Sequence, residues 1–178
     1  MATPIRSFLS ITLLALASAG ALADTLGIES RRLDSLAANQ GETRVSNSIA
    51  GDFTAFAGSP ENADSLVQGL RNGASINLTD PAALPGTPSG LSFTSPTRPI
   101  GYGNIFISLS LAQKQLAALG ITNPTPAQLQ AALTGGTVLT ATGPVTLKGI
   151  LQMRADGMGW GKIANTLGFK LGSVVSGL

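Results

Sequence analysis

Three acidic residues that lie close together in the sequence, Asp52, Glu61 and Asp64, are the first candidates for chemistry. Two carboxylates that flank a cleft are the groups that hydrolyse glycosidic bonds. The chain has no His and no Cys, which excludes Ser-His-Asp and Cys-His nucleophilic systems and the usual zinc, copper and haem sites. Carboxylate chemistry or a Ser/Lys pair remains. The simpler interpretation is structural, with Glu61 at a helix start and the two aspartates exposed.

The stretch GMGWGKIANTLG, residues 157–168, is the second candidate because three glycines surround the only Trp. A glycine-rich phosphate loop follows a strand within a βαβ unit, whereas here a helix is expected before the glycines. The stretch also has the spacing of a helix-turn-helix, with a second helix over about Leu171 to Leu178. That helix has no Arg, Asn or Gln to contact bases. We therefore expect a structural joint, with Trp160 lying across it and available to a partner.

Four residues are candidates for binding a partner, and none is a catalytic candidate. Trp160 lies in the glycine joint, Arg71 lies between Gly69 and Gly73, and Tyr102 and Asn104 lie in the motif GYGN. For Arg71, Tyr102 and Asn104 the alternative is helix capping or turn formation. No metal ligand and no cofactor-binding residue is predicted.

Helical periodicity and capping residues indicate how these candidates are positioned. Apolar residues recur on one helical face within 42–57, and Gly58 ends that helix. Ser59 followed by Pro60 begins a second helix that Gly73 ends. A very apolar helix, expected to be central, begins at Asn104 as its cap and continues to Gly120.

The segment 74–101 is different in character, since it holds five of the ten prolines. It is predicted to be a loop-rich crossing, with short runs at 76–79 and 91–94 that would pair as a small hairpin. After it, Thr125, Pro126 and Gln128 form a capping box at the start of a short helix. Residues 137–142 are a strand or an extended loop, 147–155 a helix, and 163–167 the start of a last helical piece.

The N-terminus predicts export. Arg6 precedes an apolar run that closes on Ala21-Leu22-Ala23, the small-x-small pattern of a signal peptidase site. The run is shorter than the roughly 20 residues of a spanning helix, so we expect cleavage and no stable membrane insertion afterwards. Charged residues make up 11% of the chain and the net charge is +2, which gives no strong field to attract nucleic acid.

Three blocks of the sequence resemble a family of small exported proteins of Gram-negative bacteria with no established activity. They are ENADSLVQGLRNG, GYGNIFISLSLAQKQLAALGITNPTPAQLQAAL and LKGILQMRADGMGWGKIANTLGFKLGSVV, and GMGWG-x-IA-x-x-LG is the most specific part. The resemblance implies a periplasmic or secreted location and no catalytic residue.

The sequence thus predicts a mostly α fold. It would be a single compact helical domain with a Pro/Gly-rich central loop, at most a minor β-hairpin, and a helix-turn-helix-like C-terminal unit. The expected parts are a signal peptide at 1–23, a flexible arm at 24–41 and the domain at 42–178.

The predicted function is that of a non-enzymatic binding or structural module of the cell envelope. Its partner would be an unknown envelope protein or a second copy of the chain, with no nucleic acid and no cofactor. The alternatives are a carboxylate-based hydrolase of envelope polymers and, less favoured, nucleic-acid binding through the C-terminal segment.

Overall fold

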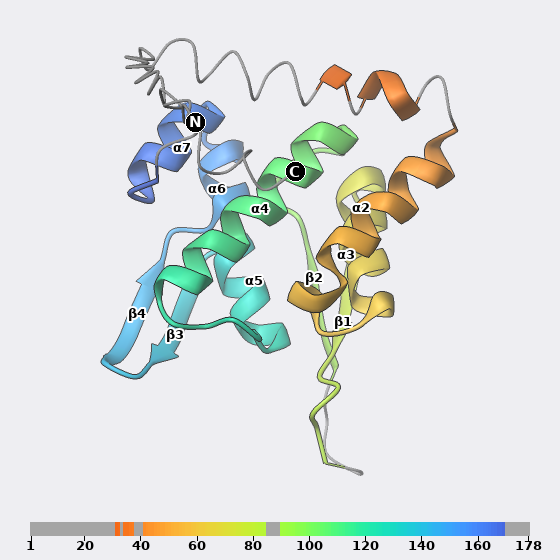
Figure 1. Cartoon of the computed structure of the whole chain (residues 1–178). Coiled ribbons are helices and arrows are strands. Elements are labelled where there is room, and N and C mark those ends of the chain that lie inside the picture. The colour runs from red at the N-terminus through yellow and green to blue at the C-terminus, as the bar shows by residue number, and fades with distance from the viewer. Residues whose placement is uncertain (1–30, 33, 38–40, 85–89, 170–178) are drawn as a thin grey trace, which may run out of the picture.

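The structure is a computed structural model that describes residues 31–32, 34–37, 41–84 and 90–169. It is mostly α-helical, with two small antiparallel hairpins (Figure 1). Within the expected arm, residues 31–32 and 34–37 are helical, and Ala37 lies in the core. The expected signal peptide at 1–23 lies outside the described residues.

Helices α2 (Glu42–Ala57) and α3 (Pro60–Asn72) form a tight helical hairpin beside the rest of the molecule (Figure 1). Gly58 ends α2 with φ 86°, a left-handed conformation that glycine adopts without strain. The Ser59 hydroxyl accepts a hydrogen bond from the Asn62 N–H and caps α3, as its sequence position predicts. These two helices and their ends are confirmed.

Helix α4 (Tyr102–Ala118) is the central element, and the other helices pack around it (Figure 1). Most of its side chains are buried, in agreement with the broad apolar face seen in the sequence. The ring centroids of Phe53 on α2 and Phe106 on α4 lie 5.3 Å apart in an edge-to-face contact. Helix α4 therefore contacts both the α2–α3 hairpin and the helices of the C-terminal half, and so links the two.

The expected start of α4 is wrong by three residues, since Asn104 was expected to be its N-cap. Gly101, in an extended conformation, is the N-cap, and it has no side chain with which to cap the helix. Asn104 lies inside the first turn instead, and its side-chain oxygen accepts a hydrogen bond from Trp160. The local preference of asparagine for a cap is overridden by a partner 56 residues away in the sequence.

The C-terminal half contains α5 (Pro126–Thr134), α6 (Ile150–Ala155) and α7 (Trp160–Thr166). The capping box at Thr125 and Gln128 is present, with Thr125 N–H donating to Gln128 Oε1 at 2.9 Å. The helix expected from Leu147 begins only at Ile150, because Leu147 belongs to a strand.

The two hairpins pair strands that are neighbours in the sequence. Strand β1 (Ser75–Thr79) pairs with β2 (Gly90–Thr94), and β3 (Gly136–Thr140) pairs with β4 (Gly143–Leu147). The first hairpin matches the two runs expected in the loop-rich crossing. The second closes through a short turn at residues 141–142 and packs against α5.

The predicted fold class is therefore wrong. It allowed at most one minor hairpin and a helix-turn-helix-like C-terminal unit, whereas the described residues form helices with two separate hairpins. Strands β3 and β4 pair with each other within residues 136–147, and the short apolar runs did not reveal this pairing. The second helix of the expected unit, at 171–178, lies outside the described residues.

Among the helices of the described part, none combines the length and the apolar character that crossing a bilayer requires. The chain is also free of Cys, so packing of its core and hydrogen bonding must stabilise the fold without disulfides.

Candidate binding surface at the N-terminal end of α4

The structure brings all four predicted binding residues to the N-terminal end of α4. Tyr102 and Asn104 belong to its first turn. Trp160 Nε1 donates to Asn104 Oδ1 at 2.9 Å, and the Arg71 guanidinium lies 4.8 Å from the centroid of the Tyr102 ring. Arg71 on α3 thus contacts Tyr102, and Trp160 on α7 contacts Asn104, although the sequence separates the members of each pair widely.

Arg71 is anchored rather than free. Its Nη2 lies 2.7 Å from Glu42 Oε1, and both side chains are partly exposed. The Glu42 carboxylate raises the pKa of Arg71 above its ordinary value, which keeps the guanidinium charged. Tyr102 is only 3% exposed, so its ring supports Arg71 and does not face solvent. The ion pair between Arg71 and Glu42 joins the start of α2 to the end of α3.

Trp160 is half-buried and lies between two polar partners. Asn104 accepts its indole N–H, and the guanidinium of Arg154 lies 5.2 Å from its ring centroid. Arg154 also donates from Nη1 to the Met158 carbonyl at 3.0 Å, across the turn after α6. The indole is therefore held in one orientation, with an arginine over its face.

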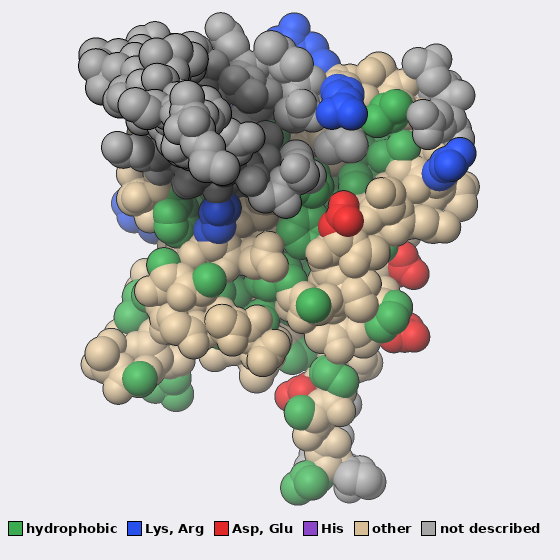
Figure 2. Space-filling view, in the orientation of Figure 1, with side chains coloured by type: hydrophobic (Ala, Val, Ile, Leu, Met, Phe, Trp, Pro, Cys, Tyr) green, Lys and Arg blue, Asp and Glu red, His purple; other side chains and the backbone are tan. Residues whose placement is uncertain are grey.

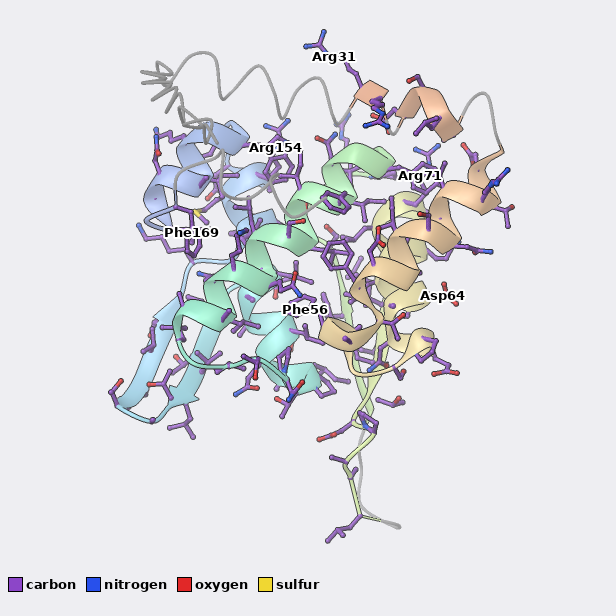
Figure 3. The ribbon with its side chains drawn as sticks, viewed as in Figure 1. Arg31, Phe56, Asp64, Arg71, Arg154 and Phe169 are labelled. Carbon is purple, nitrogen blue, oxygen red and sulfur yellow. The ribbon has the colours of Figure 1, made fainter. Side chains whose placement is uncertain are left out.

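Arg154 was not among the predicted binding residues. The sequence placed it only at the end of a short helix, where an arginine is common for electrostatic reasons. Its position six residues before the only Trp, across a glycine turn, is the signal that could have identified it. Figure 3 shows Arg154 and Arg71 near the same end of α4.

A surface pocket adjoins this cluster. It has a volume of about 480 Å³ and lies between the segment after β2 and the end of α6. Its lining residues are Pro96, Thr97, Arg98, Pro99, Ile100, Arg154 and Ala155. Two arginines thus line one pocket beside a half-buried Trp, and guanidinium groups bind carboxylates and phosphates through paired hydrogen bonds. We call Arg98, Arg154 and Trp160 the arginine–tryptophan surface.

The start of α4 already holds an acidic side chain. The Gly103 N–H donates weakly to Asp34 Oδ1, at 3.4 Å. A Cβ at Gly101 would lie 2.6 Å from the same carboxylate oxygen, so a side chain at this position would displace the Asp34 carboxylate from its present place. The positive end of the helix dipole is thus occupied by a residue of the chain itself.

Charge is unevenly distributed along helix α3. Glu61 and Asp64 lie at the start of α3, and Arg71 lies in its last turn. Figure 2 shows Lys and Arg side chains mainly over the upper part of this face and acidic ones mainly over its lower right. Although the net charge of the chain is small, positive and negative side chains lie mainly on different parts of this face.

The three acidic candidates do not form a cluster in the described structure. Asp52, Glu61 and Asp64 are exposed, and no three His, Cys, Asp or Glu residues of the described part come together as metal ligands. The pKa of Glu61 is lowered because the backbone N–H of Glu61 and the hydroxyl of Ser59 donate to its carboxylate. A carboxylate with a lowered pKa is stabilised in its charged form, as expected at a helix N-terminus. A glutamate that acts as a general acid needs a raised pKa instead.

The glycine stretch is a joint between α6 and α7. Gly157 has φ 85° and ends the turn after α6, whereas Gly159 is an extended N-cap. Trp160 is the first residue of α7 and packs against the core from one side. The stretch follows a helix and not a strand, so the context of a phosphate loop is missing.

Comparisons with protein-family models, with curated proteins and with solved structures give no match to this chain. The resemblance to small exported proteins of Gram-negative bacteria therefore stays a prediction, and the functional argument depends on the site itself.

Proposed function

We propose that this chain is an exported, non-enzymatic binding module of the bacterial cell envelope that binds an acidic protein segment. The observation that carries the proposal is the arginine–tryptophan surface, where Arg98 and Arg154 line one pocket and Trp160 lies against Arg154. Trp and Arg are the residues that contribute most to protein-binding surfaces. The guanidinium groups would pair with carboxylates of the partner, and the indole would contact an apolar side chain beside them.

Two features support binding over a purely structural role for these residues. Arg154 is held in place by Trp160 and by the Met158 carbonyl, so little side-chain freedom is lost when a ligand binds. Within the part of the chain that the structure describes, no acidic side chain forms an ion pair with Arg98 or Arg154, whereas Glu42 pairs with Arg71. Their charges are therefore available to an outside carboxylate.

Crosslinking in cells that produce the full chain tests the partner. A photoreactive amino acid replaces Thr97 in the pocket, and a matched one replaces Thr142 in the turn of the second hairpin. We expect one protein to be captured from position 97 and not from 142. Arg98→Gln and Arg154→Gln should each weaken the purified complex by about tenfold, and more so at low salt. Equal capture from both positions, or unchanged affinity in both variants, would reject the proposal.

Export is tested separately by the mass of the protein recovered outside the cytoplasm. We expect a mature chain that begins at Asp24, because Ala21 and Ala23 provide the small residues that a signal peptidase requires. Replacing Ala23 by Phe should leave the precursor uncleaved. Recovery of the intact chain with Met1 from the cytoplasm alone would contradict export.

A further inference from the structure

Strand β3 has an edge on which no other strand is paired. Strands β3 and β4 form a sheet of their own, and their hairpin projects from the molecule beside α5, at the lower left of Figure 1. Such a sheet has two edges, and the N–H and C=O groups along each edge can bind a further strand. The two edges of this hairpin differ in whether they allow that.

The turn at residues 141–142 determines which backbone groups lie along each edge. The residues on either side of this two-residue turn form the first hydrogen-bonded pair of the hairpin. Because hydrogen-bonded and non-hydrogen-bonded pairs alternate in an antiparallel ladder, Leu139 and Pro144 form a non-hydrogen-bonded pair. The same holds for Thr137 and Thr146. The main-chain N–H and C=O groups of these residues therefore point outward, along the edges of the hairpin.

Pro144 blocks the edge of β4, whereas the edge of β3 is open. Pro144 has no N–H, and a proline on an edge strand prevents a further strand from pairing there. On β3, the N–H groups of Thr137 and Leu139 donate to no other element of the described part. The first hairpin is protected differently, since the Asn77 N–H of β1 donates to Ser65 Oγ on α3 at 2.8 Å.

The lack of charge favours a second copy of the same edge as the partner. No Asp, Glu, Lys or Arg occurs within residues 115–147, and Figure 2 shows none at the lower left, where this hairpin lies. A charged partner would find no opposite charge there, whereas two uncharged edges approach each other without repulsion. Leu139 is 75% exposed, so a second copy of β3 would also cover an apolar side chain.

We propose that two copies of this chain pair antiparallel through β3, about a two-fold axis at Val138. Thr137 of each copy then lies opposite Leu139 of the other, and each such pair exchanges two main-chain hydrogen bonds. The two Leu139 side chains become diagonal neighbours on one face of the joined sheet, within reach of each other. Since β3 has only 5 residues, the dimer is weak and depends on concentration. It does not depend on the arginine–tryptophan surface.

Thr137→Pro tests the open edge, and Thr146→Pro, at the position directly opposite, is its matched control. Each removes one outward N–H and the same contact between two threonine hydroxyls. Sedimentation equilibrium of the full chain is measured from roughly 10 µM to 1 mM. We expect the unmodified chain, Thr146→Pro and Arg154→Gln to dimerise alike, and Thr137→Pro to dimerise about tenfold more weakly. A monomer throughout this range, or equal weakening in both proline variants, would overturn the proposal.

Introduced cysteines test the register of the two strands and do not require that a proline variant fold. The chain has no Cys of its own. Hydrogen-bonded antiparallel pairs place their Cα atoms about 5.5 Å apart, a separation that a disulfide spans. A mixture of Thr137→Cys and Leu139→Cys chains should therefore form a disulfide-linked heterodimer on oxidation. A mixture of Thr146→Cys and Leu139→Cys chains should not, because β3 would lie between the two thiols. Equal yields from the two mixtures would reject pairing through β3.

Discussion

Asn62 joins three segments of the chain through one buried side chain. Its Nδ2 donates to the carbonyls of Ala57 and Thr79, at 2.8 Å in each case, and its Oδ1 accepts the Thr79 N–H at 2.9 Å. It is 1% exposed. The end of α2, the start of α3 and the end of β1 therefore depend on a single amide.

Replacing Asn62 by Ala should lower the free energy of unfolding by about 3 kcal/mol, because buried backbone groups of Ala57 and Thr79 lose their partners. Urea denaturation measures the change. Asn72→Ala is the control on the same helix, since that exposed amide donates only to Gln68. Its effect should stay within about 0.5 kcal/mol. Similar decreases in the free energy of unfolding of the two variants would show that Asn62 does not link the three segments.

The Glu61 side chain makes a pH-dependent contribution to the stability of the fold. Its pKa is lowered in the folded protein by the backbone N–H of Glu61 and the Ser59 hydroxyl. The folded state thus binds the proton more weakly than the unfolded state does. The stabilisation is present above the unfolded pKa and is lost as the pH falls through the folded pKa.

We expect a titration of Glu61 followed by NMR to give a midpoint below that of an unstructured glutamate, and Ser59→Ala to raise that midpoint. Glu61→Gln should remove this part of the acid dependence of stability and leave the remainder. A midpoint at or above the ordinary glutamate value would contradict the capping arrangement.

At the scale of elements, a close approach of two backbones sets how α5, the second hairpin and α6 join. Gly149 has φ 78°, and a Cβ at this position would contact Gly135 N and Thr134 C, with Thr134 O at 2.8 Å. The approach is between main-chain atoms, so a neighbouring side chain cannot move aside to relieve it. The end of α5 and the start of α6 can therefore pack this closely only where position 149 is a glycine.

Gly149→Ala should therefore destabilise the protein by about 3 kcal/mol or more, as backbone strain and a steric clash act together. Gly157→Ala is the matched control. It has φ 85° but open space around it, so about 1 kcal/mol is expected from strain alone. Thermal unfolding of both variants measures the difference, and equal effects would show that the close approach is not significant.

The helices show which elements the sequence could predict. Glu42–Ala57 and Pro60–Asn72 carry their own periodicity, caps and terminating glycines, so local chemistry was sufficient. Leu147 was placed in a helix because it lies at helical spacing from Ile150 and Leu151. In the structure Leu147 pairs with Gly136 across the second hairpin, and such pairing cannot be read from a short apolar run.

At the scale of the whole molecule, buried residues form one hydrophobic cluster that extends from Ala37 to Ala164 and includes members of α2 to α7. Helix α4 contributes to it from most of its faces. Because the elements share this cluster, the described part of the chain should unfold as a cooperative unit.

Trp160 makes that expectation measurable. Its fluorescence reports the joint between α6 and α7, whereas far-ultraviolet circular dichroism reports all the helices. We expect the two signals to give the same urea midpoint in the full chain, and the Trp160 contact with Asn104 to be lost in the same transition. A fluorescence midpoint clearly below that of the dichroism would show that the C-terminal helices unfold independently.

The sequence by itself determined the residue types available for chemistry and the local structure that short-range interactions control. The lack of His and Cys, the helix ends at Gly58 and Gly73 and the capping box at Thr125 follow from residue identity and near neighbours. Tertiary structure decided which residues meet. Asn104 accepts the Trp160 N–H, and Gln115 Oε1 is buried without a hydrogen-bond partner, because of how α4 packs against the C-terminal helices. Such contacts depend on the position of whole elements in space, and no local pattern specifies that position.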